Sequence, residues 1–155
     1  MAVLKAMGLS RMYGKKHSVI WALRDVDLCV EAGEFIGVMG PSGSGKTTLL
    51  NLLAAVDTPT SGKVEINGVE LSKLNDTNLA VFRRRNLGFI FQDYNLLNTL
   101  SIRENVALSL ALDNVQPAEI LRRVDEVSRQ LGIAGILDKR VFEISGGEQQ
   151  RAAIA

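Results

Sequence analysis

The sequence predicts an α/β fold, and three patterns indicate it. An apolar run at residues 34–39 leads into a glycine-rich loop and then into an apolar, helix-forming segment at residues 48–55. Residues 22–30 alternate apolar and polar side chains, as in a strand that buries one face. Capping patterns mark the starts of further helices later in the chain. With 155 residues, 46% of them hydrophobic and 23% charged, the chain suits one globular domain with a sizeable core.

The first part of the chain is predicted to hold strands. Residues 3–7 and 22–30 are expected to be extended, and the apolar side chains of the second segment share one face: Val26, Leu28 and Val30. Residues 34–39 are predicted to be a buried strand that enters the glycine-rich loop. Residues 63–70 are expected to form a hairpin around Asn67-Gly68, because that dipeptide favours a tight primed turn.

The later elements are mostly helical. Residues 76–85 are predicted to be a polar helix that ends in three arginines, and residues 87–91 a buried strand. Ser101 and Glu104 have capping-box spacing ahead of a helix at 102–112. Pro117 opens a helix that runs to residues 130–131, where Gly132 ends it.

The glycine-rich loop matches the phosphate-binding motif G-x-x-x-x-G-K-(S/T) at residues 40–47. Its glycines let backbone N–H groups point inward, which suits a di- or triphosphate, and the following helix start adds partial positive charge. Lys46 is predicted to reach the β- and γ-phosphates and the Thr47 hydroxyl to bind Mg²⁺. The alternative is a chance glycine-rich turn. The predicted nucleotide-binding residues here are Gly40, Pro41, Ser42, Gly43, Ser44, Gly45, Lys46, Thr47 and Thr48.

A second motif, I-S-G-G-E-Q-Q-R at residues 144–151, resembles the LSGGQ signature of ABC-transporter ATPases. Ile144 replaces the usual Leu and Glu148 the usual last Gln. Ser145 and Glu148 also have capping-box spacing, so a plain helix cap before residues 149–155 is the other interpretation. The resemblance implies that the signature contacts the γ-phosphate of ATP held by the other subunit through Ser145, Gly146, Gly147 and Glu148.

The layout resembles an ABC nucleotide-binding domain over the whole chain. This implies a P-loop NTPase fold with a RecA-like core, an N-terminal antiparallel β subdomain and a helical subdomain, with the C-terminal core strands missing. The expected parts of this partial domain over residues 1–155 are the N-terminal strands (1–39), the P-loop and its helix (40–56), the hairpin, helix and strand to the Q-loop (57–92), the helical subdomain (93–144) and the signature with the start of its helix (145–155).

The resemblance assigns two more nucleotide contacts. Gln92 matches the family's Q-loop, where an amide oxygen reaches Mg²⁺ or the attacking water; an ordinary glutamine at a strand end is the alternative. Tyr13 matches the aromatic residue that stacks on adenine. Trp21 competes for that role, and Tyr13 as a plain surface aromatic is the third possibility.

The implied activity is ATP hydrolysis coupled to transport, with ATP and Mg²⁺ as cofactors and Lys46 and Gln92 as catalytic residues. The family's catalytic Glu and switch His have no counterparts in these 155 residues, since His17 precedes the P-loop in a polar segment and is expected to be solvated. Turnover by this chain alone is therefore doubtful, and the chain is expected to be unstable without two further strands. A nucleotide-binding module without turnover and a non-functional fragment are the alternatives.

Short segments such as residues 57–62 and 87–93 are similar to exporters of lipoproteins, macrolides and antimicrobial peptides. Residues 49–54 and 83–88 are most similar to the bacitracin-type systems. The implied partners are a separate transmembrane permease and a second nucleotide-binding domain in a head-to-tail dimer. A cytoplasmic position at the inner membrane face follows from the permease, and the single Cys29 agrees with a reducing compartment. A net charge of +1 argues against nucleic acid, and residues 83–85 are expected to be a solvated helix end. No apolar run is long enough for membrane insertion.

Overall fold

The computed structural model describes residues 2–14 and 18–155, so His17 lies outside the described residues. The chain forms two compact units, one that ends at Gly88 and one from Phe89 to Ala155. Each unit has a hydrophobic core of its own.

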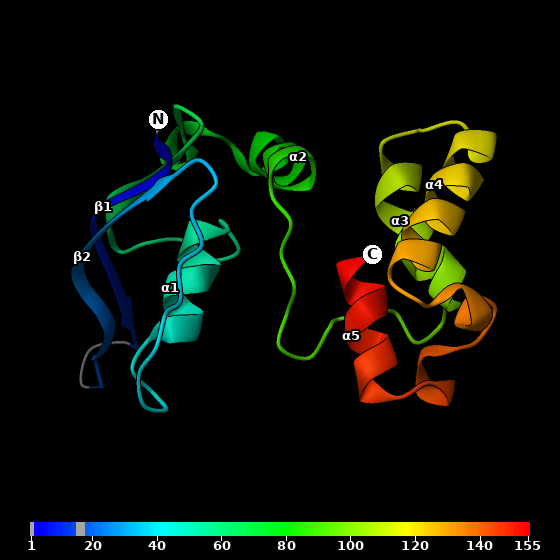
Figure 1. The fold of residues 1–155 in the computed structure, drawn as a ribbon. Helices are drawn as coiled ribbons and strands as arrows, with labels where there is room; N and C mark the ends of the chain where they lie inside the picture. The colour runs from blue at the N-terminus through cyan, green and yellow to red at the C-terminus, as the bar shows by residue number, and fades with distance from the viewer. Residues whose placement is uncertain (1, 15–17) are drawn as a thin grey trace. The chain divides into compact units, whose positions relative to one another are not determined.

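The first unit is built on an antiparallel sheet with the strand order β2-β1-β3-β4 (Figure 1). Its two long strands, β1 (Ala2–Tyr13) and β2 (Ile20–Glu31), pair along most of their length. The sheet continues through β3 (Ser61–Ile66) to the short β4 (Val69–Glu70). The predicted antiparallel β subdomain is therefore confirmed, and β1 is longer than the expected 3–7 because it continues past an irregularity at Gly8 to pair with the start of β2.

The predicted hairpin is also confirmed. Asn67 and Gly68, between β3 and β4, have φ values of 49° and 79°. A two-residue turn with positive φ at both positions matches the right-handed twist of the flanking strands. Asn and Gly adopt this conformation more readily than other residues, so the local sequence alone sets the register of β3 and β4.

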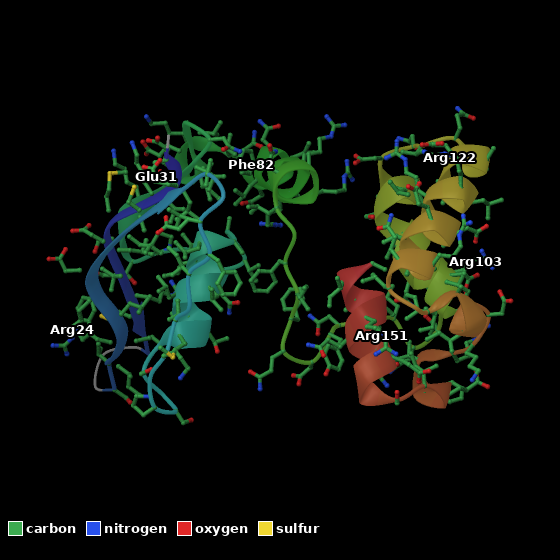
Figure 2. All side chains as sticks on the ribbon, in the orientation of Figure 1. Arg24, Glu31, Phe82, Arg103, Arg122 and Arg151 are labelled. Carbon is green, nitrogen blue, oxygen red and sulfur yellow. The ribbon has the colours of Figure 1, made fainter. Side chains whose placement is uncertain are left out.

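Helix α1 (Lys46–Leu53) packs on the sheet and supplies Leu49, Leu52 and Leu53 to the core (Figure 1). A short 3₁₀ turn, η1 (Leu71–Lys73), leads to α2 (Asp76–Asn86), which adds Phe82 to the edge of that core (Figure 2). Asn75 caps α2 by accepting a hydrogen bond from the Asn78 N–H. The buried members of this core are Ala6, Leu9, Leu23, Leu49, Leu52, Leu53, Ala55, Val64, Ile66 and Leu71.

Two predicted buried strands are wrong. Residues 34–39 and 87–91 are not strands in the structure, and they pair with no strand among residues 2–14 and 18–155. Phe35 is 98% exposed and Met39 92% exposed. An apolar run becomes a buried strand only when neighbours supply ladder hydrogen bonds and cover both faces. The apolar composition of these segments favours a buried strand, but the described sheet does not extend to them.

The second unit consists of three helices and two 3₁₀ turns within its described residues: α3 (Ile102–Leu112), α4 (Pro117–Gln130), η2 (Ala134–Ile136), η3 (Val141–Glu143) and α5 (Gly146–Ile154) (Figure 1). The bounds of α3 and α4 agree with the prediction, and α5 begins three residues earlier than residue 149. The buried side chains of this unit are Ile102, Val106, Val124, Ile133, Ile136, Leu137, Val141, Ile144 and Ala152.

Polar contacts tie the helices of this unit together. The Arg103 side chain on α3 donates to Asp125 of α4 at 3.0 Å and to Asp138 at 3.3 Å (Figure 2). The Arg103 N–H donates to the Leu137 carbonyl, and the Ile102 N–H donates to the Lys139 carbonyl. These contacts fix the segment before η3 against the start of α3, and the signature motif follows directly after η3.

Candidate functional site

The phosphate-binding motif forms a loop that ends at the first turn of α1. Lys46 is the first residue of the helix, and its ammonium group turns back over the loop. The Lys46 Nζ donates to the Gly40 carbonyl at 2.9 Å and to the Pro41 carbonyl at 2.7 Å. Among the described residues, no side chain caps the start of α1. An uncapped helix start beside a lysine ammonium is a favourable environment for an anion.

Gly45 holds this helix start close to the sheet. It has a φ of 91°, and a Cβ placed on it would lie 2.4 Å from the Ala22 carbonyl oxygen of β2. Only glycine combines this left-handed conformation with so close a backbone approach. The start of α1 therefore packs closely against Ala22 and Leu23 of β2.

Tyr13 ends β1, opposite the beginning of β2. Its hydroxyl donates to Asp57 Oδ2 at 2.6 Å, and the Arg11 guanidinium lies 4.6 Å from the centre of its ring. The residue is 41% exposed, so part of the ring stays open to solvent. Trp21, the competing aromatic residue, pairs with Met12 in the same sheet and has Arg24 at 5.6 Å from its ring.

The signature motif forms the start of α5 in the second unit. The predicted capping box is present: Ser145 Oγ accepts from the Glu148 N–H, and the Glu148 carboxylate accepts from the Ser145 N–H at 2.8 Å and from Ser145 Oγ at 2.7 Å. Gly146 and Gly147 follow in the first turn, and Ser145, Gly146 and Gly147 are all exposed. The helix-cap interpretation is thus confirmed, and it leaves the backbone N–H groups of a first helical turn at an exposed position.

Gln92 lies in the second unit, in an exposed turn that precedes α3. The chain turns sharply after it, because Tyr94 and Asn95 have φ values of 59° and 52°. Further along, the side-chain amide of Asn105 on α3 holds the backbone of Leu97 through two hydrogen bonds. Its Oδ1 accepts from the Leu97 N–H at 2.7 Å, and its Nδ2 donates to the Leu97 carbonyl at 3.1 Å. The structure therefore divides the predicted site residues between the units, with the P-loop and Tyr13 in the first and Gln92 and the signature in the second.

Sequence inspection alone missed several supporting residues. Asp57 contacts Arg11 and Tyr13 across more than forty residues of chain, and no local pattern signals such contacts. Asn105 resembles any polar helix residue in sequence. Gln149 donates to the Val141 carbonyl at 3.1 Å and so orders the segment before the signature; its place in the motif is the one signal available.

The arginine triplet at residues 83–85 lies in the last turn of α2, as expected. Arg83 donates to the Ala55 carbonyl at 2.8 Å, next to the C-terminal end of α1. A cation near a helix C-terminus is favourable, so this arginine has a structural partner.

The acidic cap of α5 gives a pH-dependent prediction. Hydrogen bonds from the Ser145 N–H and hydroxyl hold the pKa of Glu148 below its usual value of 4.5. A depressed pKa stabilises the folded state above about pH 4.5, and this contribution is lost as the pH falls through the folded-state pKa. We expect the difference in melting temperature between the parent and Glu148→Gln to shrink as the pH falls from 7 to 3, followed by circular dichroism. A difference that stays constant over this range would contradict the prediction.

Two features are absent from the described residues. None of the helices in residues 2–14 and 18–155 has the length and apolar character needed to cross a bilayer. The same residues contain no group of three or more His, Cys, Asp or Glu side chains placed to hold a metal ion. A magnesium ion bound with a nucleotide does not require such a group, because it takes most of its ligands from phosphates and water.

A phosphate-binding loop seated on an antiparallel sheet, and a capped signature helix in the same chain, define a nucleotide-binding protein of the P-loop class. The comparisons with known proteins agree. A family model described as ABC transporter matches residues 23–155. The chain therefore belongs to the ABC transporter family.

Similar proteins include ATP-binding proteins of export systems. The ABC transporter ATP-binding protein YvcR of Bacillus subtilis is 56% identical over the whole of this chain and 61% of its own length. The bacitracin export ATP-binding protein BceA of Halalkalibacterium halodurans is 44% identical over the whole of this chain and 61% of its own length. The macrolide export ATP-binding/permease protein MacB of Neisseria gonorrhoeae is 39% identical over this chain and 24% of its own length.

The fold also matches solved ABC cassettes. A dimeric structure of the ATP-binding cassette MJ0796, in a post-hydrolysis state with bound ADP and Pi, gives a TM-score of 0.91 at 35% identity. The match covers 97% of this chain and 67% of that chain. These values confirm the predicted ABC fold class. The chain spans about three fifths of the length of YvcR and BceA.

Proposed function

We propose that this chain binds ATP as part of the ATP-binding subunit of an ABC exporter. The observation that carries the proposal is the uncapped start of α1, with the Lys46 ammonium folded over the loop that precedes it. The polyphosphate lies along the N–H groups of this loop, and Lys46 stabilises negative charge at the β- and γ-phosphates. Tyr13 supports the adenine ring with its exposed part.

The donors available for Mg²⁺ suit that ion. The Thr47 hydroxyl and the Gln92 amide oxygen are both oxygen ligands, and Thr47 is exposed in the first turn of α1. When bound, Mg²⁺ would neutralise charge on the β- and γ-phosphates. Lys46 and Gln92 are the residues of this chain to which we assign catalytic roles, Lys46 as a charge stabiliser and Gln92 as a contact to the attacking water.

The exposed first turn of α5 supports a second proposed contact. Gly146 and Gly147, next to Ser145, offer backbone donors at a helix start, which can bind the γ-phosphate of a nucleotide held by another subunit. Two subunits arranged head to tail would then share each nucleotide. We assign a separate transmembrane permease as the further partner, at the inner face of the membrane, and peptide antibiotics as the transported class, since BceA is named for bacitracin export.

The test is nucleotide binding and turnover by the 155-residue chain. We expect titration calorimetry with MgATP to show saturable binding of one nucleotide per chain. Phosphate release measured in the same samples separates an active ATPase from a module that only binds. A folded chain that does not bind MgATP at millimolar concentrations would contradict the proposal.

A further inference from the structure

We propose that Asp57 and Arg11 position the ring of Tyr13. Asp57 follows the end of α1, so this helix indirectly fixes the aromatic ring that would stack on the nucleotide base. This inference rests on the proposed function, which assigns Tyr13 to adenine. Asp57 and Arg11 are positioning residues, because they act on the nucleotide only through Tyr13. They determine how the chain distinguishes a nucleotide from a bare polyphosphate.

The contacts of Tyr13 restrain its ring from two directions. Its hydroxyl donates to Asp57 Oδ2 at 2.6 Å, which fixes the far end of the side chain. The Arg11 guanidinium lies over the ring at 4.6 Å from its centre and covers one face. The residue is nevertheless 41% exposed, so these contacts leave part of it open to solvent. A planar base needs an exposed aromatic surface in a fixed orientation, and a partly exposed ring that is held at its hydroxyl and by Arg11 suits this need.

Asp57 is held firmly enough to act as an anchor. Its Oδ1 accepts from Arg11 Nη2 at 2.7 Å and from the Thr58 N–H at 2.8 Å. Its own N–H donates to the Asn51 carbonyl at 3.2 Å, within the last turns of α1. Burial raises the pKa of Asp57, but the hydrogen bonds from Tyr13 and Thr58 and the charge of Arg11 outweigh it, so the pKa lies below its ordinary value. Asp57 is therefore an ionised acceptor at neutral pH.

The register of the sheet places Tyr13 beside the P-loop. Tyr13 pairs with Ile20 of β2, and Arg11 pairs with Leu23. Gly45, at the start of α1, is seated on Ala22 and Leu23 of that same strand. Tyr13, which would stack on the base, and the phosphate loop thus both lie against one short stretch of β2. Helix α1 also links them, because it begins at Lys46 of the loop and leads to Asp57, the hydrogen-bond partner of Tyr13.

A purely structural role is the competing explanation, since the same contacts also tie β1 to the end of α1. The two explanations differ in their dependence on the base. A structural defect would weaken the binding of any ligand of the P-loop, whereas a misplaced ring would weaken only ligands that carry a base. Inorganic tripolyphosphate has the phosphates of ATP and no base, so it distinguishes the two.

The experiment compares dissociation constants for MgATP and for magnesium tripolyphosphate by calorimetry. We expect Asp57→Ala and Tyr13→Phe each to weaken ATP binding by about two- to tenfold, the range of one aromatic contact, and to leave tripolyphosphate binding unchanged. The double variant should be no weaker than the weaker single variant, because both changes break the same hydrogen bond. Asp57→Asn, which keeps the size of the side chain, should show a smaller loss in the same direction and serves if Asp57→Ala does not fold.

The control is Trp21→Ala, which removes a second half-exposed aromatic residue with a nearby arginine. Within the described part of the chain, Trp21 makes no side-chain hydrogen bond to Asp57. We expect this variant to keep the parent preference for ATP over tripolyphosphate. Equal losses for both ligands in Asp57→Ala, or no loss for ATP, would overturn the positioning role. If the proposed function itself is wrong, the result is different: neither ligand would bind more tightly to the parent than to Lys46→Ala.

Discussion

A Lys46→Ala variant is expected to bind MgATP about 100-fold more weakly than the parent chain, because one or two charge-assisted hydrogen bonds to phosphate are worth roughly 1.5–3 kcal/mol each. The Lys46 ammonium lies 2.7–2.9 Å from the carbonyl oxygens of Gly40 and Pro41, inside the loop that would receive the phosphates. The measurement is calorimetric titration with MgATP.

The matched control for this prediction is Lys46→Arg, which keeps the positive charge but not the compact ammonium. It should lose less affinity than Lys46→Ala. Both variants should melt close to the parent temperature, since the loop around Lys46 is largely exposed. A Lys46→Ala chain with the parent affinity for MgATP would show that the loop is an ordinary turn and not a phosphate site.

A Gly45→Ala variant is expected to lose about 2–5 kcal/mol of unfolding free energy, through a left-handed backbone penalty of about 1–2 kcal/mol and an overpacking cost of about 1–3 kcal/mol. The added methyl group would lie 2.4 Å from the Ala22 carbonyl oxygen. That oxygen belongs to a strand paired with β1, so it cannot move away freely. Urea unfolding, followed by circular dichroism, measures the loss.

Gly43→Ala is the control for this substitution. Gly43 also has a positive φ, of 79°, but a Cβ there would meet no atom within 4 Å. This variant should pay only the backbone penalty of about 1–2 kcal/mol. Equal losses in the two variants would show that the contact between the start of α1 and β2 contributes nothing.

Local signals in the sequence were sufficient to predict the bounds of α3 and α4 in the second unit. Ser101 and Glu104 specify where α3 begins, and Pro117 does the same for α4. These devices act within a few residues, so no knowledge of the tertiary structure is needed to recognise them. The phosphate loop and the signature are likewise continuous in sequence, and their residue types alone suggested the chemistry.

Features that depend on distant partners could not be predicted in this way. The strands expected at residues 34–39 and 87–91 have the right composition, but a strand exists only where another strand pairs with it. The contact between Tyr13 and Asp57 joins positions 44 residues apart, and each residue alone resembles an ordinary surface residue. The sequence therefore predicted the phosphate loop from a continuous motif, whereas the residues that contact Tyr13 became apparent only in the structure.

The cap of α5 limits how the Ser145 hydroxyl could hydrogen-bond to a phosphate bound at the signature motif. A serine hydroxyl carries one proton, and Ser145 now donates it to the Glu148 carboxylate at 2.7 Å. A phosphate oxygen offers no proton in return, so the Ser145 hydroxyl can donate to a phosphate only by giving up its hydrogen bond to Glu148. In the proposed signature contact, the phosphate and the Glu148 carboxylate would therefore compete for a single hydrogen atom, while the two backbone hydrogen bonds of the capping box could stay in place.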